Sequence, residues 1–290
     1  MIRATAADGQ IRAFAVTARA AVDYARKQHG MSPECSAALG RLMMGGLMMG
    51  MMMKDDRDLL TLQVIGDGPM KSVTVTADRN GHVKGFCGNA GASVPEKHKG
   101  KLDVGTAVGQ GILRVMKDTG GKEPYIGTVA LVSGEIAEDL TYYFAQSEQT
   151  PSVVGLGVLV DTDLSVKEAG GFIVQLMPDA SDETIARLEE TIQGLLPVTT
   201  MLSEGKDPGE MLGEVLNGLS MKVLEEKTVS FSCDCGKERI TSSLSVIAKE
   251  ELSDMIENAE PIEVRCQFCS KKYIFSIEEL KKILEKGKKT

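Results

Sequence analysis

The 290-residue sequence contains no tryptophan, and its aromatic content is only 4%. Hydrophobic residues nonetheless make up 42% of the chain. This excludes wholesale disorder and predicts a core built from Val, Leu, Ile and Met. Basic residues are outnumbered by acidic ones, 33 against 41, so the formal net charge is -8. Because phosphate binding relies on clustered Lys and Arg, the charge balance argues against nucleic acid as the main partner. The one basic patch, Lys281, Lys282 and 286–289, is interpreted as a solvated tail.

The chain also lacks a long uninterrupted apolar run. Its first ten residues include Arg3 and Asp8, so the apolar core of a signal peptide is missing. The longest apolar stretch, Leu42 to Met53, contains three glycines and is about half the length of a membrane span. We therefore expect a cytoplasmic protein with no membrane partner. In that compartment, paired cysteines are more often metal ligands or redox sensors than permanent disulfides.

Groups typical of catalysis are scarce as well. The chain has only three histidines, at positions 29, 82 and 98, and none is spaced as a metal ligand relative to the cysteines. We expect all of them at surface or loop positions. No Ser-His-Asp set or carboxylate pair stands out, and the glycine-rich stretch 105–111 lacks the Gly-Lys-Ser/Thr ending of a phosphate loop. We do not expect an enzyme.

Strand and helix signals are mixed over residues 1–180. Helical patterns continue to Tyr24, begin again at Pro33 and run through the methionines, and recur from Ile136 to Ser147. Apolar alternation and turn residues predict strands at 11–16, 60–65, 72–76, 125–132, 152–160 and 172–177. The irregular interleaving of these elements predicts an α+β core domain rather than a doubly wound sheet.

Residues 181–227 have a different character, which predicts a metastable helical linker. Ser181 is a helix N-cap, and Ile185, Leu188, Ile192 and Leu195 would share one helical face. Shorter helices are expected near 198–202 and 210–219. Five glycines and two prolines interrupt the segment, at positions 194, 205, 209, 213 and 218, and 197 and 208. Each interior glycine costs roughly 0.5–1 kcal/mol relative to alanine, so these helices should depend on docking against neighbours.

The last segment, residues 228–290, contains four of the six cysteines as two close pairs. Cys233 and Cys235 form a Cys-x-Cys pair, and Cys266 and Cys269 form a Cys-x-x-Cys pair thirty residues later. Four thiolates brought together make a closed tetrahedral zinc site. The other apolar residues form a small core, which we expect to comprise Phe231, Val264, Phe268, Tyr273, Ile274, Phe275 and Ile277. A domain of this size with so thin a core commonly needs a metal to fold.

The same sulfurs could instead form two local disulfides, and oxidation excludes metal binding because zinc needs thiolates. Structural zinc contributes about 10–16 kcal/mol to the folding of small peptide domains at neutral pH. A disulfide that closes a loop of a few residues contributes at most about 2 kcal/mol. Loss of the metal therefore outweighs the gain of the bonds. The domain should unfold on oxidation and expose apolar surface.

The cysteine pattern alone leaves different functions open. One is a stress-activated binding protein switched by the metal site, and the alternative is a zinc-ribbon adaptor that keeps its metal permanently. A thiol-disulfide oxidoreductase using Cys266 and Cys269 is less favoured, because no thioredoxin-like βαβ setting is evident. Metal release under mild oxidation would separate the first two.

Other blocks of the sequence narrow the choice. They are Gly66-Asp-Gly-Pro69, Ile136-Ala-Glu-Asp-Leu140, Tyr143-Phe-Ala-Gln-Ser-Glu-Gln149 and Ala169-Gly-Gly-Phe-Ile-Val-Gln175. With the cysteine pattern, they make the chain resemble, over essentially its full length, the redox-regulated holdase chaperones of the thirty-three-kilodalton heat-shock protein family, the 33 kDa chaperonins.

The resemblance implies an α+β core, a helical linker and a C-terminal zinc module with Cys233, Cys235, Cys266 and Cys269 as metal ligands. It implies that the reduced, zinc-bound form is inactive. Oxidation would form the disulfides Cys233–Cys235 and Cys266–Cys269, release zinc and unfold the linker. The chain would then tend to dimerise and would bind unfolding client proteins without ATP.

Two further features are interpreted as structural. The methionine-rich stretch from Arg41 to Met53 could contact clients, since methionine side chains adapt to irregular partners, but we favour a core helix because it is apolar on all sides. Cys35 and Cys87 are isolated in the sequence, and we expect them to be buried, inert thiols.

Overall fold

The computed structural model describes residues 1–95, 101–245, 256 and 261–286. The chain divides into two compact units, Met1–Ser232 and Cys233–Thr290. Each unit is described by itself below.

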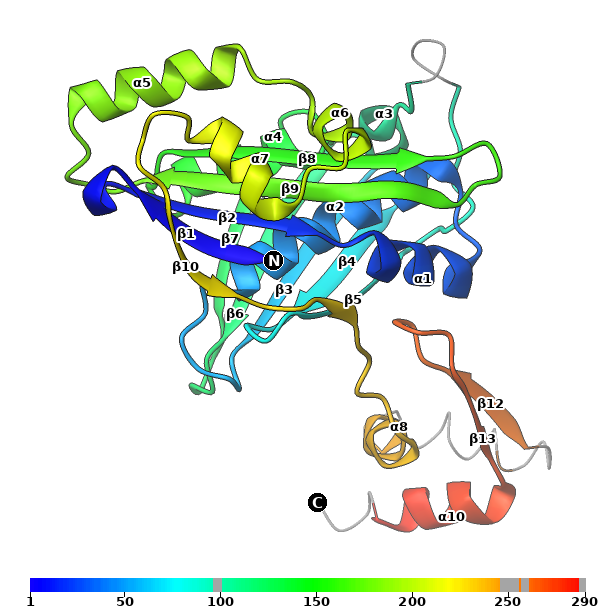
Figure 1. Ribbon diagram of the computed structural model, residues 1–290. Helices are drawn as coiled ribbons and strands as arrows, with labels where there is room; N and C mark the ends of the chain where they lie inside the picture. The colour runs from blue at the N-terminus through cyan, green and yellow to red at the C-terminus, as the bar shows by residue number, and fades with distance from the viewer. Residues whose placement is uncertain (96–100, 246–255, 257–260, 287–290) are drawn as a thin grey trace. The chain divides into compact units, whose positions relative to one another are not determined.

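Two sheets form the framework of the first unit (Figure 1). The five-stranded sheet has the order β10 (Lys222–Glu226), β1 (Ile2–Ala6), β2 (Ile11–Thr17), β9 (Val166–Leu176) and β8 (Ser152–Val160). The six-stranded sheet has the order β11 (Ser230–Phe231), β5 (His82–Cys87), β4 (Ser72–Ala77), β3 (Leu59–Gly66), β6 (Gly111–Asp118) and β7 (Tyr125–Ala130). All pairs are antiparallel except β11 with β5. The expected α+β class is confirmed.

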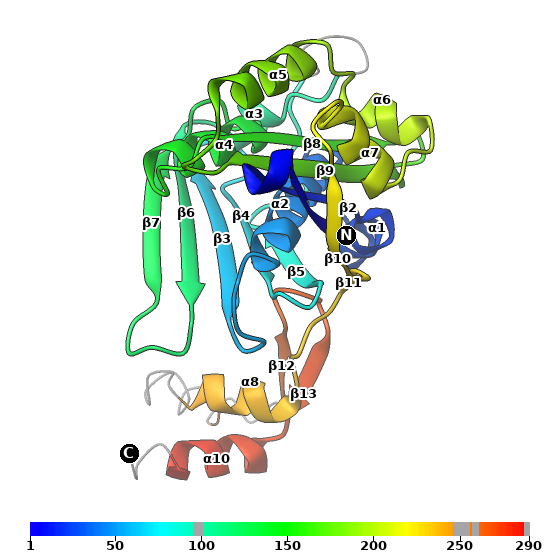
Figure 2. The same cartoon turned by 60° about the vertical axis from the view of Figure 1, so that its left-hand side comes forward.

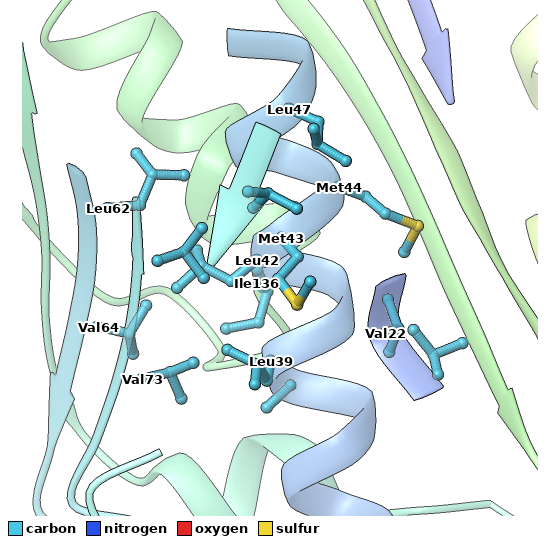
Figure 3. Close-up of a cluster of buried hydrophobic side chains, with 14 of the residues drawn as sticks. Val22, Leu39, Leu42, Met43, Met44, Leu47, Leu62, Val64, Val73 and Ile136 are labelled. Atoms are coloured by element: carbon cyan, nitrogen blue, oxygen red, sulfur yellow. The ribbon is translucent and has the colours of Figure 1, made fainter. Parts of the chain in front are cut away.

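Helix α2 (Pro33–Gly50) lies between the two sheets (Figure 2). Ser32 caps its N-terminus by accepting a hydrogen bond from the Cys35 amide, and Pro33 occupies the first turn. In Figure 3 its side chains meet Leu62, Val64 and Val73 of the six-stranded sheet. Met43, Met44 and Met48 are fully buried. The methionine-rich stretch is therefore a core helix, as predicted.

The glycines at positions 40 and 45 of α2 lie where neighbouring helices come close to it. A Cβ atom on Gly40 would lie 2.7 Å from Val22 Cγ1, and one on Gly45 would lie 2.6 Å from Leu140 Cδ1. No real Cβ sits this close to another carbon, so larger residues would push the helix away from its partners. The glycines that interrupt the apolar run thus serve packing.

The other helices of the first unit surround this framework. Helix α1 (Arg19–His29) packs on β9 and α2, and α4 (Ala137–Gln146) packs on β7 and β8. The short elements η1 (Ala7–Gly9) and α3 (Val104–Val108) complete the set.

Helices α5 (Asp182–Gln193), α6 (Val198–Ser203) and α7 (Pro208–Val215) occupy the segment predicted to be a linker. Ser181 caps α5 by accepting the Thr184 amide, as expected. Helices α6 and α7 pack on β9, and they share a second apolar cluster with β1 and β2 that is separate from the core around α2. Met201, Met211 and Leu212 are fully buried in it. The helices thus depend on a docked apolar face, and their behaviour as a separable linker remains a prediction.

Several boundaries differ from those expected from the sequence. Strand β9 begins at Val166 rather than 172, β7 ends at Ala130 rather than 132, and α7 ends at Val215 rather than 219. Strand β9 starts earlier because residues 166–171, which include two glycines, pair with β8 in a long hairpin. Strands β1, β5, β6 and β10 were not predicted.

In its described residues, the second unit is built on a β12–β13 hairpin and two helices. Strand β12 (Ile262–Arg265) pairs with β13 (Lys272–Phe275), and α8 (Lys237–Leu244) and α10 (Ile277–Lys286) supply the remaining apolar side chains. The ammonium of Lys237 lies 2.6 Å from the Glu279 carboxylate, which joins α8 to α10. The cluster includes Val264, Phe268, Tyr273 and Phe275, as expected.

Three members of the expected core are corrected. Ile277 is half-buried and lies outside the cluster. Ile274 is 63% exposed, because it points to the opposite face of β13 from Tyr273 and Phe275. Phe231 belongs to the first unit, where its ring centroid lies 5.0 Å from that of Tyr24. Its strand pairs with β5, a long-range contact that the sequence does not reveal. Leu244, Leu280 and Ile283 take their places in the core.

Candidate metal centre

The structure brings the four C-terminal cysteines together. Cys233 and Cys235 precede α8, and Cys266 and Cys269 lie in the turn between β12 and β13. All four Sγ atoms lie within 4.8 Å of one another. Two sulfur contacts cross between the pairs: Cys233 and Cys266 are 3.7 Å apart, and Cys235 and Cys269 are 3.3 Å apart. Each pair therefore faces the other.

A tight turn presents the second pair. The amide of Ser270 donates to the Cys266 carbonyl at 2.8 Å, and the amide of Cys266 donates to the Lys271 carbonyl at 3.0 Å. Ser270 adopts a left-handed backbone conformation with φ of 56°. This folds the chain back on itself between the strands, so that both sulfurs point to the same side.

The first pair is positioned by α8 and by Tyr273. Asp234, between the two cysteines, forms an ion pair with Arg239 of α8. The Tyr273 hydroxyl of β13 donates to the Cys235 carbonyl oxygen at 3.1 Å and lies 3.2 Å from its Sγ. Tyr273 thus ties Cys-x-Cys to the hairpin that carries Cys-x-x-Cys. Sequence reasoning assigned Tyr273 to the core and missed this polar role.

The thiols have unequal acidities. Burial is the main cause that raises the pKa of Cys233 to about 12, and burial also raises the pKa of Cys269. Burial opposes ionisation of Cys235 too, but hydrogen bonds from Tyr273 and the neighbouring thiols outweigh it and lower the pKa of Cys235 to about 7. The hydrogen bond to Cys235, followed by burial, raises the pKa of Tyr273 to about 12. The cluster therefore favours a negative charge on the Cys235 sulfur.

The donor set fits a tetrahedral thiolate-bound metal. Zinc–sulfur bonds of about 2.3 Å place the ligand sulfurs of a tetrahedron about 3.8 Å apart. The distances of 3.7 and 3.3 Å across the pairs, and the limit of 4.8 Å for all pairs, are close to this spacing. Cys266 is buried and the other three are half-buried, so the site is shielded by the small core. These four cysteines could hold a metal ion.

The remaining residues singled out in the sequence lie elsewhere. His82 is exposed and its Nδ1 lies 2.9 Å from Asp78, while His29 ends α1, and His98 lies outside the described residues. Cys35 and Cys87 are buried, as predicted, but they are neighbours in the fold rather than isolated. Across residues 1–95, 101–245, 256 and 261–286, no second group of three or more potential metal ligands is present. Nor does any described helix have the length and apolarity to cross a membrane.

Comparison with known proteins agrees with this arrangement. The family model described as Hsp33 protein matches residues 1–276. The 33 kDa chaperonin of Agathobacter rectalis is 52% identical over 283 residues, covering 98% of both chains. That of Clostridioides difficile is 51% identical over 286 residues, also covering 98% of both. The crystal structure of the 33 kDa chaperonin (heat shock protein 33 homolog) of Thermotoga maritima superimposes with a TM-score of 0.90 at 35% identity, covering 100% of this chain and 99% of the other. The chain therefore belongs to the Hsp33 family.

Proposed function

We propose that this protein is a redox-regulated molecular chaperone, an ATP-independent holdase located in the cytoplasm. In the reduced form Cys233, Cys235, Cys266 and Cys269 bind one Zn²⁺ and the chaperone is inactive. Oxidation converts the thiolates into the disulfides Cys233–Cys235 and Cys266–Cys269 and releases zinc. The oxidised chain exposes apolar surface, forms a homodimer and binds unfolding client proteins, preventing their aggregation. Membership of a family whose relatives are named chaperonins supports the chaperone role.

One observation carries the proposal: the four sulfurs cluster at the centre of a unit that has little else to hold it together. Within the described residues, only six hydrophobic residues of this unit are buried, and Cys266 is one of them. Fully burying a large apolar side chain stabilises a fold by about 1.5–3 kcal/mol. In a unit of this size, the chain entropy lost on folding largely offsets that gain. Removing the ligands should therefore unfold the unit.

Disulfide formation within each pair would disrupt the cluster. In the reduced structure sulfur contacts cross between the pairs, from Cys233 to Cys266 and from Cys235 to Cys269. Bonding Cys233 to Cys235 turns each sulfur away from its cross-pair neighbour and removes its thiolate charge. The pairing itself rests on the resemblance to the family.

A short connection would carry this change into the first unit. Only Ser232 separates Cys233 from β11, which is held to β5 over two residues, with the Ser232 amide donating to the Val83 carbonyl at 2.9 Å. Upstream of β11, residues 181–227 contain helices α5–α7, with three glycines at or beyond the helix ends and two inside α7. We propose that these residues form the metastable linker, between a core domain of residues 1–180 and a redox-switch domain of residues 228–290. Undocking the linker would expose the cluster around Met201, Met211 and Leu212 to clients.

The test is suppression of client aggregation before and after oxidation. The zinc-loaded, reduced protein is treated with hydrogen peroxide at heat-shock temperature, and light scattering of a thermally denaturing enzyme is followed in the presence of each form without ATP. We expect suppression only by the oxidised form, reversed by dithiothreitol. Equal suppression by both forms would refute the switch. Retention of zinc under the same oxidation would favour the permanent zinc-ribbon adaptor.

A further inference from the structure

A second thiol pair lies inside the first unit, away from the candidate metal centre. Cys35 in the first turn of α2 and Cys87 at the end of β5 are 52 positions apart in the sequence. In the fold, the Cys87 Sγ lies 3.8 Å from the Cys35 carbonyl oxygen. The Cys35 side chain is fully buried and Cys87 is 8% exposed. Two thiols from separate elements thus share one site in the core.

The surroundings of Cys35 favour ionisation of this thiol over that of its neighbour. Cys35 is the third residue of an 18-residue helix, where the amide dipoles stabilise negative charge. A hydrogen bond between the two thiol side chains is the largest cause that lowers the pKa of Cys35, although burial opposes it. The same hydrogen bond, together with burial, raises the pKa of Cys87. The acidities of the two thiols thus differ in the direction that favours Cys35 as the nucleophile of the pair.

A single short segment covers the pair and is fastened to the first turn of α2. The Cys35 Sγ lies 3.2 Å from the Asn89 carbonyl oxygen and 3.7 Å from that of Ala92. Ser32, the N-cap of α2, binds the same segment through its amide to the Ala90 carbonyl at 2.9 Å and its hydroxyl to Ala92. The segment has neither helix nor strand.

We propose that Cys35 and Cys87 form a third oxidisable dithiol, which closes to a disulfide when the protein meets a two-electron oxidant such as hydrogen peroxide. The Cys35 thiolate attacks one peroxide oxygen, and with a proton the second oxygen leaves as water, giving a sulfenic acid. The Cys87 thiol then attacks the Cys35 sulfur, and the sulfenic oxygen leaves as a second water. Two thiols and one peroxide thus give one disulfide and two waters.

This disulfide would stabilise its unit, whereas oxidation of the cysteines at the metal centre would destabilise theirs. It joins the start of α2 to the end of β5 and closes a loop of 52 residues within one unit. A cross-link over a long loop stabilises chiefly by restricting the unfolded chain. The first unit would therefore be reinforced under the oxidising conditions that take the C-terminal unit apart.

Thiol mapping of the full-length protein tests the proposal. The native protein is oxidised with hydrogen peroxide, free thiols are blocked with iodoacetamide, disulfides are reduced, and the released thiols are labelled with N-ethylmaleimide before digestion and mass spectrometry. We expect all six thiols to be lost and a Cys35–Cys87 cross-linked peptide to appear in the unreduced digest. Loss of only four thiols, with Cys35 and Cys87 alkylated solely after denaturation, overturns the proposal.

Three further experiments test whether the cross-link depends on the native fold. A full-length variant with serine at positions 233, 235, 266 and 269 should still lose two thiols, and its oxidised form should melt at a higher temperature than its reduced form. The same oxidation in guanidinium chloride should form the cross-link more slowly, since denaturation separates the partners. In Cys87→Ser the sulfenic acid on Cys35 should be trapped by dimedone. A cross-link that forms equally fast in the denatured chain contradicts the proposal.

Discussion

The Tyr273 hydroxyl lies 3.2 Å from the Sγ of Cys235 and 3.1 Å from the carbonyl oxygen of the same residue. One side chain thus contacts both a candidate ligand atom and the backbone that holds it. Such contacts orient metal ligands and stabilise their ionised form. Because Tyr273 comes from β13 and Cys235 precedes α8, the contact also joins the two halves of the candidate site.

Replacing Tyr273 by Phe should weaken metal binding by about 10-fold, because outer contacts of metal ligands typically contribute 10- to 100-fold in affinity. A metal that is bound less tightly protects the four thiolates less, so their reaction with peroxide should become faster. Chelator competition measures the affinity, and thiol titration during oxidation measures the rate. Tyr142→Phe, in the exposed face of α4, is the matched control and should change neither. An affinity equal to that of wild type would show that the hydroxyl has no role at the site.

Removing the metal from the reduced protein should unfold the C-terminal unit and leave the core around α2 folded. Its apolar cluster is small, whereas structural zinc contributes about 10–16 kcal/mol to such domains. We expect a strong chelator to abolish the amide chemical-shift dispersion of residues 261–286 in nuclear magnetic resonance spectra and to leave that of the α2 core unchanged. Readdition of zinc should restore the signals. A metal-free protein with dispersed signals throughout would contradict the structural role of the ion.

Shortening Leu212 to Ala should loosen the proposed linker. Leu212 of α7 is fully buried in the cluster on the five-stranded sheet, and such a truncation costs about 2–5 kcal/mol. We expect increased proteolysis within residues 181–227 and some client binding by the reduced form. Leu196→Ala is the matched control, since Leu196 lies in the same segment but is 46% exposed. If protease sensitivity rises while holdase activity stays absent until oxidation, linker docking does not restrain the chaperone.

Ionisation of the Asp23 carboxylate should make the stability of the first unit depend on pH in the acidic range. Burial opposes its ionisation, but hydrogen bonds from Lys27, Arg26 and the Val166 amide lower the pKa of Asp23 to about 2. The ordinary value is 3.8, so the ionised form stabilises the fold above about pH 4. This contribution is lost as the pH falls from about 4 to 2.

Asp23→Asn should therefore destabilise the unit by about 1–2 kcal/mol at pH 7, a figure reduced from the full shift because the side chain is 19% exposed. The difference from wild type should shrink below pH 4. Denaturant unfolding of both proteins across this pH range measures it. Asp179→Asn, at an exposed position, serves as the control. A difference that is constant down to pH 2 would show that ionisation of Asp23 is not its source.

Local signals in the sequence predicted much of the fold. Pro33 in the first turn of α2 and the cap Ser181 of α5 indicated where these two helices start. The apolar character of the methionine-rich stretch on all sides predicted its burial. The spacing of the C-terminal cysteines predicted their clustering, because a four-thiolate site imposes its own geometry.

What the sequence could not show depends on long-range pairing. Strand β1 is completed by β10, with Ile2 opposite Glu226, and nothing near either residue indicates the other. Phe231 was assigned to the cysteine unit by proximity in sequence, yet its strand joins β5 of the first unit. The contact between Cys35 and Cys87 likewise arises only when α2 packs on β5. The features that sequence motifs do not predict are therefore those that depend on strand register and on packing between distant segments.

The central claim is that the thiolate-bound metal keeps the chaperone inactive. It is tested most directly by stepwise oxidation of one zinc-loaded sample, with released zinc, disulfides among Cys233, Cys235, Cys266 and Cys269, and suppression of client aggregation measured on every aliquot. The account predicts that the three quantities rise together, and that reduction with zinc present reverses them together. Full suppression by an aliquot that has kept its zinc, or complete zinc release with no suppression, would contradict it.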